Sequence, residues 1–350
     1  MRKYDFEPTL QRIARSDAVG IPLVGRSAEI AALRLVGARN PSLGRIFEGH
    51  VNGAQLVARF GSPEQHRSSD DAIVGGHVFG VWNTQDDAHA LRLHRCGDDV
   101  VLSGGKTWAS GAGSISRPLV TAVWPDGGLQ LCLLRMDESH ARVDKSAWRP
   151  LGMNESDSFN VDFTGLKLRK ADLIGRPGDY ECQPWFFGGA LRFAAVQTGI
   201  VERLFDETVT YVRERRRDED AMMRARVAEM RIAVRTAELW LDAGAAAWQR
   251  FDAEPSERNA AGVLDVVDMA RTAIERSALD TIERAVRSVG AHGLVEPFPF
   301  AGLVRDLQMY LRQPAPDAAL ARVGRAAFIA REPAANVPAP TSPMWQKCDF

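Results

Sequence analysis

The spacing of hydrophobic residues divides the chain into three consecutive regions. Up to about residue 73, apolar residues recur every three or four positions, which is the period of an amphipathic helix. From residue 74 to 178 they alternate with polar residues in short runs separated by Gly and Asp turns, which is typical of strands. From about residue 188 to 331 the helical period returns. The order of helices, a small β region and then long helices restricts the choice of fold.

The first region predicts short and medium helices with clear end signals. We expect a short helix over residues 9–15, a helix over 27–37 and a longer one over 44–60. Ser27 is a suitable N-cap for the second of these helices. Gly61-Ser62-Pro63 ends the third, because this tripeptide is unfavourable inside a helix.

The last region predicts an antiparallel helical bundle, because long amphipathic helices with short links pack in that way. The expected helices span residues 190–217, 224–251, 260–289, 300–311 and 318–330.

The whole pattern predicts an α+β protein made of an N-terminal helical segment, a central β-barrel or sandwich and a C-terminal bundle. We place the helical domain at 1–73, the β domain at 74–178, the bundle at 179–332 and a tail at 333–350.

The composition excludes several classes of protein. Hydrophobic residues make up 45% and charged residues 25% of the 350 residues, and the formal net charge is −1. These values are ordinary for a globular protein, and they argue against a general nucleic-acid binder or a polybasic membrane partner. The longest apolar runs are too short to cross a bilayer, so we expect no membrane span.

The cysteines and the first residues bear on the compartment. Four cysteines are scattered without a CxxC spacing, which argues against a zinc site or a disulfide framework and suits a reducing compartment. The first residues lack the apolar segment of a secretory signal. We therefore expect a cytoplasmic protein.

The stretch from Val101 to Gly113 is the strongest local candidate for a binding site. It contains a β-type run, a Gly-Gly turn, the segment Lys106-Thr-Trp-Ala-Ser110 and then small residues. In a regular strand Trp108 and Ser110 point to the same face, since they are two positions apart. Such a pair can cover a planar heterocycle and hydrogen-bond its edge. The alternative is a hairpin with a half-buried tryptophan.

Five segments in order resemble the acyl-CoA dehydrogenase flavoprotein superfamily, from about residue 37 to 331. Each is weak alone, but their shared order and spacing identify the chain as a member. The segments are Asn40-Pro-Ser-Leu43 with Arg59–Gln65, Gly105–Gly111, Leu151–Asp157 followed by Leu173-Ile-Gly175, Arg192–Ile200 with Arg215, and Gly290–Gly293 with Arg305-Asp306.

The resemblance implies FAD as the cofactor. Trp108 and Ser110 match the positions that flank the isoalloxazine ring, and Trp82-Asn83-Thr84 matches a strand that lines it. Arg215 matches an arginine that reaches the pyrophosphate of a neighbouring subunit's FAD. Arg287 stands where the superfamily has a glutamine that touches the neighbour's flavin. The alternatives are that both tryptophans belong to the core and that Arg215 lies on a solvated face.

The resemblance also implies assembly and a base, but the base is missing. Members form homodimers or homotetramers through the helical bundle. In most dehydrogenases a glutamate removes the substrate's α-proton, and Pro314 stands at that position here. Other members carry the base at a second position, which corresponds to Leu191 here, and leucine cannot accept a proton. Asp317 is the nearest carboxylate in sequence.

Three functions remain compatible with this sequence. The first, favoured by analogy, is FAD-dependent α,β-dehydrogenation of an acyl thioester, borne by CoA or a carrier protein, with a relocated base and a separate electron acceptor. The second is a flavin-dependent monooxygenase, which needs no glutamate. Against it, the histidine that such enzymes use near the Arg305-Asp306 segment is absent, and the only candidate nearby is His292, which fits a turn residue better. The third is a catalytically silent subunit that supports a partner in a hetero-oligomer.

Overall fold

The computed structural model describes residues 26–97 and 99–329. The short helix expected over residues 9–15 and the tail at 333–350 lie outside this range. The chain forms two compact units. The sheet unit contains Arg45–Arg149 and Asn154–Cys182, and the bundle unit contains Arg26–Gly44, Pro150–Met153 and the described residues from Gln183 onward.

The division into units differs from the predicted domains in one respect. Residues 26–44 cluster with the C-terminal helices, whereas residues 45–73 cluster with the strands. The expected N-terminal domain at 1–73 is therefore divided between the two units over its described part. The physical reason is that two or three amphipathic helices of this length bury too little apolar surface to form a core of their own.

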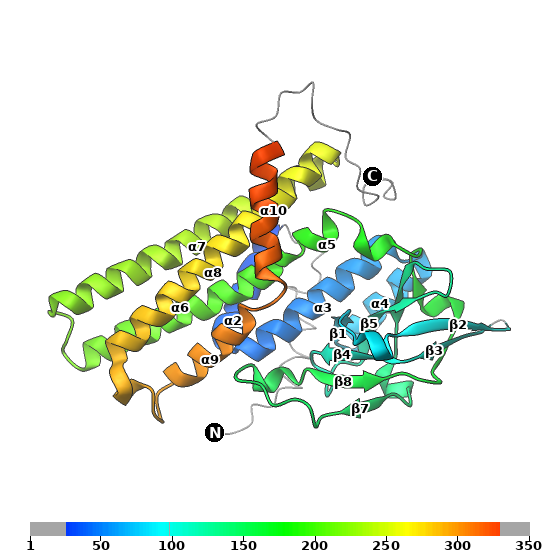
Figure 1. The fold of residues 1–350 in the computed structure, drawn as a ribbon, viewed down its shortest axis with the longest axis horizontal. Coiled ribbons are helices and arrows are strands. Elements are labelled where there is room, and N and C mark those ends of the chain that lie inside the picture. The colour runs from blue at the N-terminus through cyan, green and yellow to red at the C-terminus, as the bar shows by residue number, and fades with distance from the viewer. Residues whose placement is uncertain (1–25, 98, 330–350) are drawn as a thin grey trace. The chain divides into compact units, whose positions relative to one another are not determined.

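The bundle unit is built from long helices that lie side by side (Figure 1). All five helices expected in this region are present, and the end residues differ by a few positions. The helices are α2 (Arg26–Arg39), α5 (Trp185–Gly188), α6 (Ala190–Glu214), α7 (Ala221–Ala253), α8 (Glu257–Gly293), α9 (Phe300–Tyr310) and α10 (Pro316–Ile329).

Small residues let α2 and α6 approach closely. A Cβ atom on Gly37 would lie 2.5 Å from the main-chain oxygen of Val196, and one on Gly199 would lie 2.0 Å from that of Arg34. Both contacts are shorter than any real Cβ contact, so neither glycine accepts a side chain without moving the helices apart.

The sheet unit contains helices α3 (Pro41–Phe60) and α4 (Pro63–Val74) and ten short strands in two sheets. Helix α3 begins four residues before the unit boundary. The strands are β1 (Phe79–Trp82), β2 (Arg92–Cys96), β3 (Asp99–Ser103), β4 (Gly105–Ala109), β5 (Arg117–Val123), β6 (Leu129–Leu133), β7 (Arg142–Asp144), β8 (Phe159–Asp162), β9 (Lys167–Leu168) and β10 (Leu173–Ile174).

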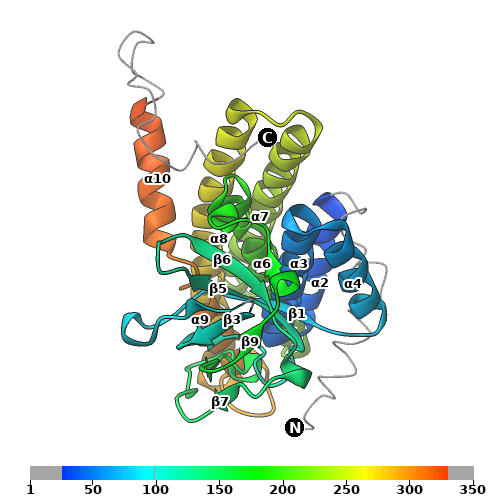
Figure 2. The ribbon, with the colours of Figure 1, turned by 90° about the vertical axis from the view of Figure 1, so that its right-hand side faces the viewer.

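The larger sheet has the order β10-β6-β5-β2-β3-β9, with β1 added parallel to β5. Figure 2 labels β1, β3, β5, β6 and β9 of this sheet. The smaller sheet has the order β4-β8-β7 and is antiparallel. A core cluster joins apolar residues of α3 to residues of β1, β5, β6 and β10. Its buried members are Leu56, Val57, Phe79, Leu119, Leu131 and Ile174.

The structure tests the predictions that the cysteines are reduced and that no helix spans a membrane. Cys96 and Cys132 are free, as expected, whereas Cys182 is disulfide-bonded, so the expectation of reduced cysteines is wrong for this residue. Within residues 26–97 and 99–329, no helix is both long and apolar enough to cross a membrane.

Candidate functional site

Trp108 is brought to the surface by a bulge in strand β4. The pairing with β8 shifts register between Lys106 and Ala109, and Trp108 has a left-handed backbone with φ of 56°. The side chain is 48% exposed, while Ser110 is buried. The regular alternation that predicted one shared face for the two residues is therefore wrong, because a bulge inserts an extra residue and redirects the side chains that follow. An exposed aromatic at such a position is a functional-site signal.

A second tryptophan holds the Trp108 indole in place. The rings of Trp108 and Trp148 meet edge to face, with centroids 5.6 Å apart and planes at 88°. Trp148 is itself fixed, because its Nε1 donates to the main-chain oxygen of Asn154 at 3.0 Å. Trp148 lies outside the five segments of the resemblance, so nothing in the sequence singled it out. Since this geometry is favourable for aromatic pairs, Trp108 presents a rigid indole to its surroundings.

Trp82 belongs to the core. It is 2% exposed, and its ring stacks on Phe163 with centroids 6.3 Å apart. Its Nε1 donates to the main-chain oxygen of Ser110 at 2.9 Å. Of the two alternatives for this residue, the core assignment is the one that the burial supports. Trp82 therefore positions Ser110 and presents no side-chain surface to a ligand.

Asn83 and Thr84 are exposed at the end of β1 and are held by a buried lysine. Lys106 Nζ donates to the main-chain oxygen of Asn83 at 3.0 Å, to Gln85 Oε1 at 2.6 Å and to Thr121 Oγ1 at 2.9 Å. Thr121 Oγ1 in turn donates to Asn83 Oδ1 at 2.7 Å. Burial lowers the pKa of Lys106 to about 7. This network fixes residues 83–85 against β4.

Ser110 is part of a chain of three hydroxyl groups. Its Oγ lies 2.9 Å from Ser158 Oγ, which lies 3.0 Å from Ser156 Oγ. The main chain is tied at the same place, because Gly111 N donates to the main-chain oxygen of Ser156 at 2.7 Å. Ser156 and Ser158 were not singled out from the sequence, since a hydroxyl chain is visible only when β4 and β8 are paired.

The sheet-unit residues fit the edge of a flavin. Trp108 offers an exposed ring, Ser110 a hydroxyl at the end of a hydroxyl chain, and Asn83 and Thr84 exposed polar groups at the adjoining strand end. An aromatic surface with a few fixed hydrogen-bonding groups suits a planar heterocycle. We find no side chain in this set that opposes such a ligand.

Arg215 and His292 lie together in the bundle unit. The Arg215 guanidinium lies 3.8 Å from the ring centroid of Tyr211 and 5.2 Å from that of Phe298. Its Nη2 donates to His292 Nδ1 at 3.1 Å. Because arginine only donates, His292 carries its hydrogen on Nε2. Arg215 is thus held by aromatic rings, and the alternative of a freely solvated arginine does not fit.

Arg287 lies on the exposed side of α8. It forms an ion pair with Glu283, four residues earlier on the same helix. Its main-chain oxygen accepts a hydrogen bond from Arg226 at 3.2 Å. Exposed pairs of this kind contribute little to stability, so the guanidinium is available for another anion. A role for Arg287 at a neighbour's flavin stays a prediction.

The position of the missing base is occupied by a short link between α9 and α10. Pro314 is exposed in this link, and Asp317 is exposed in the first turn of α10. Leu191 is buried and lines a cavity of about 10 Å³ together with Arg192 and Glu29. This volume suits one water molecule. Glu29 is buried and paired with Arg26 at 3.3 Å.

Two of the segments that carry the resemblance, around residues 151 and 305, contact each other within the bundle unit. Asp306 Oδ1 accepts a hydrogen bond from Met153 N at 2.6 Å. A Cβ atom on Gly152 would lie 2.3 Å from the main-chain oxygen of Arg305. Arg305 and Asp306 therefore anchor residues 150–153, and the Asp306 carboxylate is engaged by the main chain of Met153.

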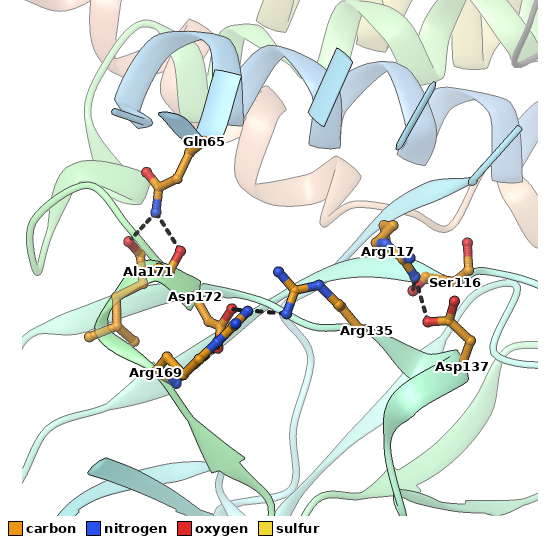
Figure 3. Close-up of polar contacts among 9 residues, drawn as sticks. Gln65, Ser116, Arg117, Arg135, Asp137, Arg169, Ala171 and Asp172 are labelled. Carbon is orange, nitrogen blue, oxygen red and sulfur yellow. Dashed lines mark hydrogen bonds and ion pairs between the residues drawn. The ribbon is translucent and has the colours of Figure 1, made fainter. Parts of the chain in front are cut away.

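A second polar cluster in the sheet unit connects α4 with the strand ends (Figure 3). Gln65 Nε2 donates to the main-chain oxygens of Ala171 and Leu173 at 2.8 and 2.9 Å. Asp172 pairs with Arg135 at 3.5 Å and Arg169 at 3.1 Å. Since Asp172 is shared by both arginines and Gln65 is bonded to main-chain oxygens, we assign the cluster a structural role. Over the described ranges, no group of His, Cys, Asp and Glu side chains has the arrangement of a metal site.

Comparison with known proteins finds similarity to acyl-CoA dehydrogenases and to dibenzothiophene monooxygenases. Residues 186–311 match the family described as acyl-CoA dehydrogenase, C-terminal domain. A 3-sulfinopropanoyl-CoA desulfinase of Cupriavidus necator is 22% identical over 294 residues, covering 77% of this chain and 71% of the relative. A dibenzothiophene monooxygenase of Rhodococcus erythropolis is 26% identical over 161 residues, covering 43% of this chain and 39% of the relative.

Two solved structures share the fold. A dibenzothiophene monooxygenase of Paenibacillus sp. A11-2, in complex with FMN and indole, has a TM-score of 0.79 at 21% identity and covers 96% of this chain and 98% of its own. Butyryl-CoA dehydrogenase of Megasphaera elsdenii has a TM-score of 0.81 at 16% identity and covers 92% of this chain and 90% of its own. These similarities confirm the predicted fold class.

Proposed function

We propose that this member of the acyl-CoA dehydrogenase superfamily is a flavin-dependent oxidoreductase whose reaction does not use the superfamily's usual glutamate base. The observation that carries the proposal is the combination of a flavin-compatible site on β1 and β4 with an exposed proline at residue 314. Removing an α-proton from a thioester needs a base within hydrogen-bond reach of it. The base-free chemistry favoured by this combination is monooxygenation of a small apolar substrate.

The assigned roles follow from the contacts. A bound reduced flavin would supply two electrons and activate dioxygen. Trp108 covers one part of the ring and excludes water, and Ser110 offers a hydrogen bond at its edge. Lys106 holds the Asn83–Gln85 segment in position through its three acceptors. FMN-containing monooxygenase structures of the same fold support this reaction.

We take FAD as the flavin, because Arg215 presents a held guanidinium to an anion. Two aromatic rings and His292 orient it, and no carboxylate of the described residues pairs with it. A guanidinium of this kind suits a pyrophosphate, which FAD has and FMN lacks. This role requires a second subunit, so a homodimer or homotetramer is part of the proposal.

A second candidate, α,β-dehydrogenation of an acyl thioester, is favoured by one observation. Glu29 is a buried carboxylate that lines the same small cavity as Leu191, the alternative position of the base in this superfamily. Against it, the cavity of about 10 Å³ is too small for a substrate, and Glu29 is engaged by Arg26. Because similar proteins are named for CoA-thioester substrates, the experiment below also tests dehydrogenation.

The test is an anaerobic titration of the purified, flavin-loaded protein. Butyryl-CoA and 3-sulfinopropanoyl-CoA serve as thioester probes, and indole and dibenzothiophene as apolar probes. We expect no bleaching of the flavin band by a thioester, but oxygen consumption and an oxygenated product when an apolar probe is added to the reduced enzyme in air. Stoichiometric bleaching by a thioester would overturn monooxygenation in favour of dehydrogenation. A protein that takes up neither FAD nor FMN would overturn both.

Trp108→Ala is the variant that connects the titration to the site. Loss of the stacking surface should weaken flavin binding about fivefold, since aromatic stacking is worth roughly 1 kcal/mol. Phe328→Ala is the control, because Phe328 is an exposed aromatic of the bundle unit, outside the site. Equal flavin affinity in both variants would contradict the assignment of Trp108.

A further inference from the structure

The three serines of the hydroxyl chain differ in depth. Ser156 is 2% exposed, Ser158 is 6% exposed and Ser110 is 7% exposed. The oxygen–oxygen distances along the chain are 3.0 Å from Ser156 to Ser158 and 2.9 Å from Ser158 to Ser110. Both contacts are hydrogen bonds of ordinary length. The chain therefore runs from the interior of the sheet unit toward the residue that we place at the flavin.

The number of hydrogens decides the direction of this chain. Three hydroxyl groups carry three hydrogens, but two contacts use only two of them. One hydrogen is left over, and its position depends on which way the hydroxyls turn. If each serine donates toward Ser110, the extra hydrogen is on Ser110 and points out of the chain. If the direction is reversed, the extra hydrogen is on Ser156.

A ligand that accepts a hydrogen bond from Ser110 favours the first arrangement. All three serines are buried, and among the described residues their hydroxyl groups have only one another as partners. An extra hydrogen on Ser156 or Ser158 is a buried donor without an acceptor, whereas an extra hydrogen on Ser110 gains an acceptor when an oxidised flavin edge lies against that hydroxyl. With such an edge bound, the difference favours the outward arrangement by roughly tenfold or more. Ser110 is then held as a hydrogen-bond donor, although a free serine hydroxyl donates or accepts equally well.

We infer that Ser156 and Ser158 are positioning residues that fix Ser110 as a donor and so make the site prefer the oxidised flavin over the reduced one. The inference rests on the proposed function. The edge of an oxidised isoalloxazine carries acceptors at N5 and at the C4 carbonyl, which match a donor. The reduced ring carries a hydrogen at N5, which opposes a donor at the same place. No covalent bond changes in this step, because only hydroxyl hydrogens are oriented.

The main chain around the serines does not depend on their hydroxyl groups. The main-chain oxygen of Ser110 accepts from Trp82 Nε1 at 2.9 Å, and that of Ser156 accepts from Gly111 N at 2.7 Å. A Ser→Ala substitution at 156 or 158 removes one hydroxyl and leaves these bonds. The variants are therefore expected to fold, and their apoprotein melting temperatures check this directly.

The experiment measures the affinity of the full-length protein for FAD and FMN in their oxidised and dithionite-reduced forms. In Ser158→Ala we expect about fivefold weaker binding of the oxidised form and unchanged or tighter binding of the reduced form. The reduction potential of the bound flavin should then rise by about 20 mV, because tenfold is 29.6 mV for a two-electron couple. Ser156→Ala should shift the potential in the same direction.

Two controls separate this effect from a general loss of structure. Ser114→Ala removes a hydroxyl that contacts the main-chain oxygen of Gly111 but lies outside the chain, and it should leave the potential unchanged. Ser158→Thr keeps the hydroxyl and should restore the wild-type potential. If Ser158→Ala binds both redox forms with equally changed or unchanged affinity, the inference is wrong while the proposed function stands. If the wild-type protein binds neither flavin, both are wrong.

Discussion

Two buried titratable residues of the sheet unit differ in how their polar atoms are satisfied. Lys106 Nζ has three acceptors, so its ammonium group keeps the hydrogen bonds that water would provide. His50 Nδ1 accepts from Phe79 N at 2.9 Å, and its Nε2 has no partner among the described residues. Burial lowers the pKa of His50 to about 4. His50 therefore stays neutral in the folded protein.

The pKa of His50 predicts a loss of stability in acid. Its folded value of about 4 lies below the unfolded value of 6.5, so the unfolded chain binds more protons between these values. The stability is complete above pH 6.5 and falls as the pH decreases toward 4. At about pH 5 the expected loss is about 2 kcal/mol relative to a variant without this group.

The measurement compares urea unfolding of the wild type and His50→Gln at about pH 7 and pH 5. Glutamine keeps a carbonyl oxygen that can accept from Phe79 N, but it does not titrate. The variant should therefore lose less stability than the wild type on acidification. Parallel losses in the two proteins would show that His50 is not the responsible group.

At the scale of elements, helix ends and strand irregularities follow different rules. The start of α4 is local: Ser62 Oγ accepts from Gln65 N at 3.3 Å, and Gln65 Oε1 accepts from Ser62 N at 2.8 Å. The sequence Ser-Pro-Glu-Gln shows this capping box directly. The bulge in β4 is not local, because it depends on how Lys106 and Ala109 pair with β8. Only the first kind of feature is predictable from neighbouring residues.

Removing the cap of α4 should have a measurable cost. Ser62→Ala leaves Gln65 N without its side-chain acceptor, and the free energy of unfolding should fall by about 1 kcal/mol. Ser68→Ala is the matched control, since Ser68 is exposed inside the same helix, where alanine is the better helix former. Urea midpoints of the two variants give the difference. A cost in Ser68→Ala equal to that in Ser62→Ala would remove the cap as the cause.

At the scale of the whole molecule, each compact unit contributes its own candidate residues. The sheet unit holds Trp108, Ser110 and Asn83, while the bundle unit holds Arg215 and the link with Pro314, where the resemblance predicts the position of the base. Asp317, the nearest carboxylate in sequence to the missing base, is an exposed residue in the first turn of α10. An acid at a helix N-terminus is favourable for the helix itself, so a structural role accounts for it.

The exposed position of Asp317 predicts that it is not a base. Asp317→Asn should keep bound flavin and turnover within about twofold of the wild type, because an exposed carboxylate at a helix start takes no part in the proton transfer. The loss of a general base would instead lower the rate by about 10²–10⁴-fold. Steady-state turnover with the substrate found in the titration gives the comparison. A drop of a hundredfold or more with flavin still bound would identify Asp317 as the displaced base and restore the dehydrogenase reaction as the first candidate.

The periodicity and the end signals of the helices were sufficient to predict most elements. The bundle helices and the helix predicted over residues 27–37 are present because their apolar stripes act within a few residues. Ser27 is the second residue of α2, which begins at Arg26, so its predicted role as the N-cap is wrong. The sequence also predicted the fold class through five segments, which the matched C-terminal domain and the solved structures confirm. Two of those segments are now explained by packing, since Gly152 fits against Arg305 and Asp306 binds Met153.

The sequence by itself determined most of the elements, the fold class and the absence of a glutamate at residue 314, because these depend on residue type and local spacing. Only the tertiary structure decided which of the two motif tryptophans is available: a bulge exposes Trp108, while packing on Phe163 buries Trp82. It also brought Ser156 and Ser158 to Ser110, 46 or more positions away in the chain. Pairing between distant strands sets these distances, and no local pattern contains that information.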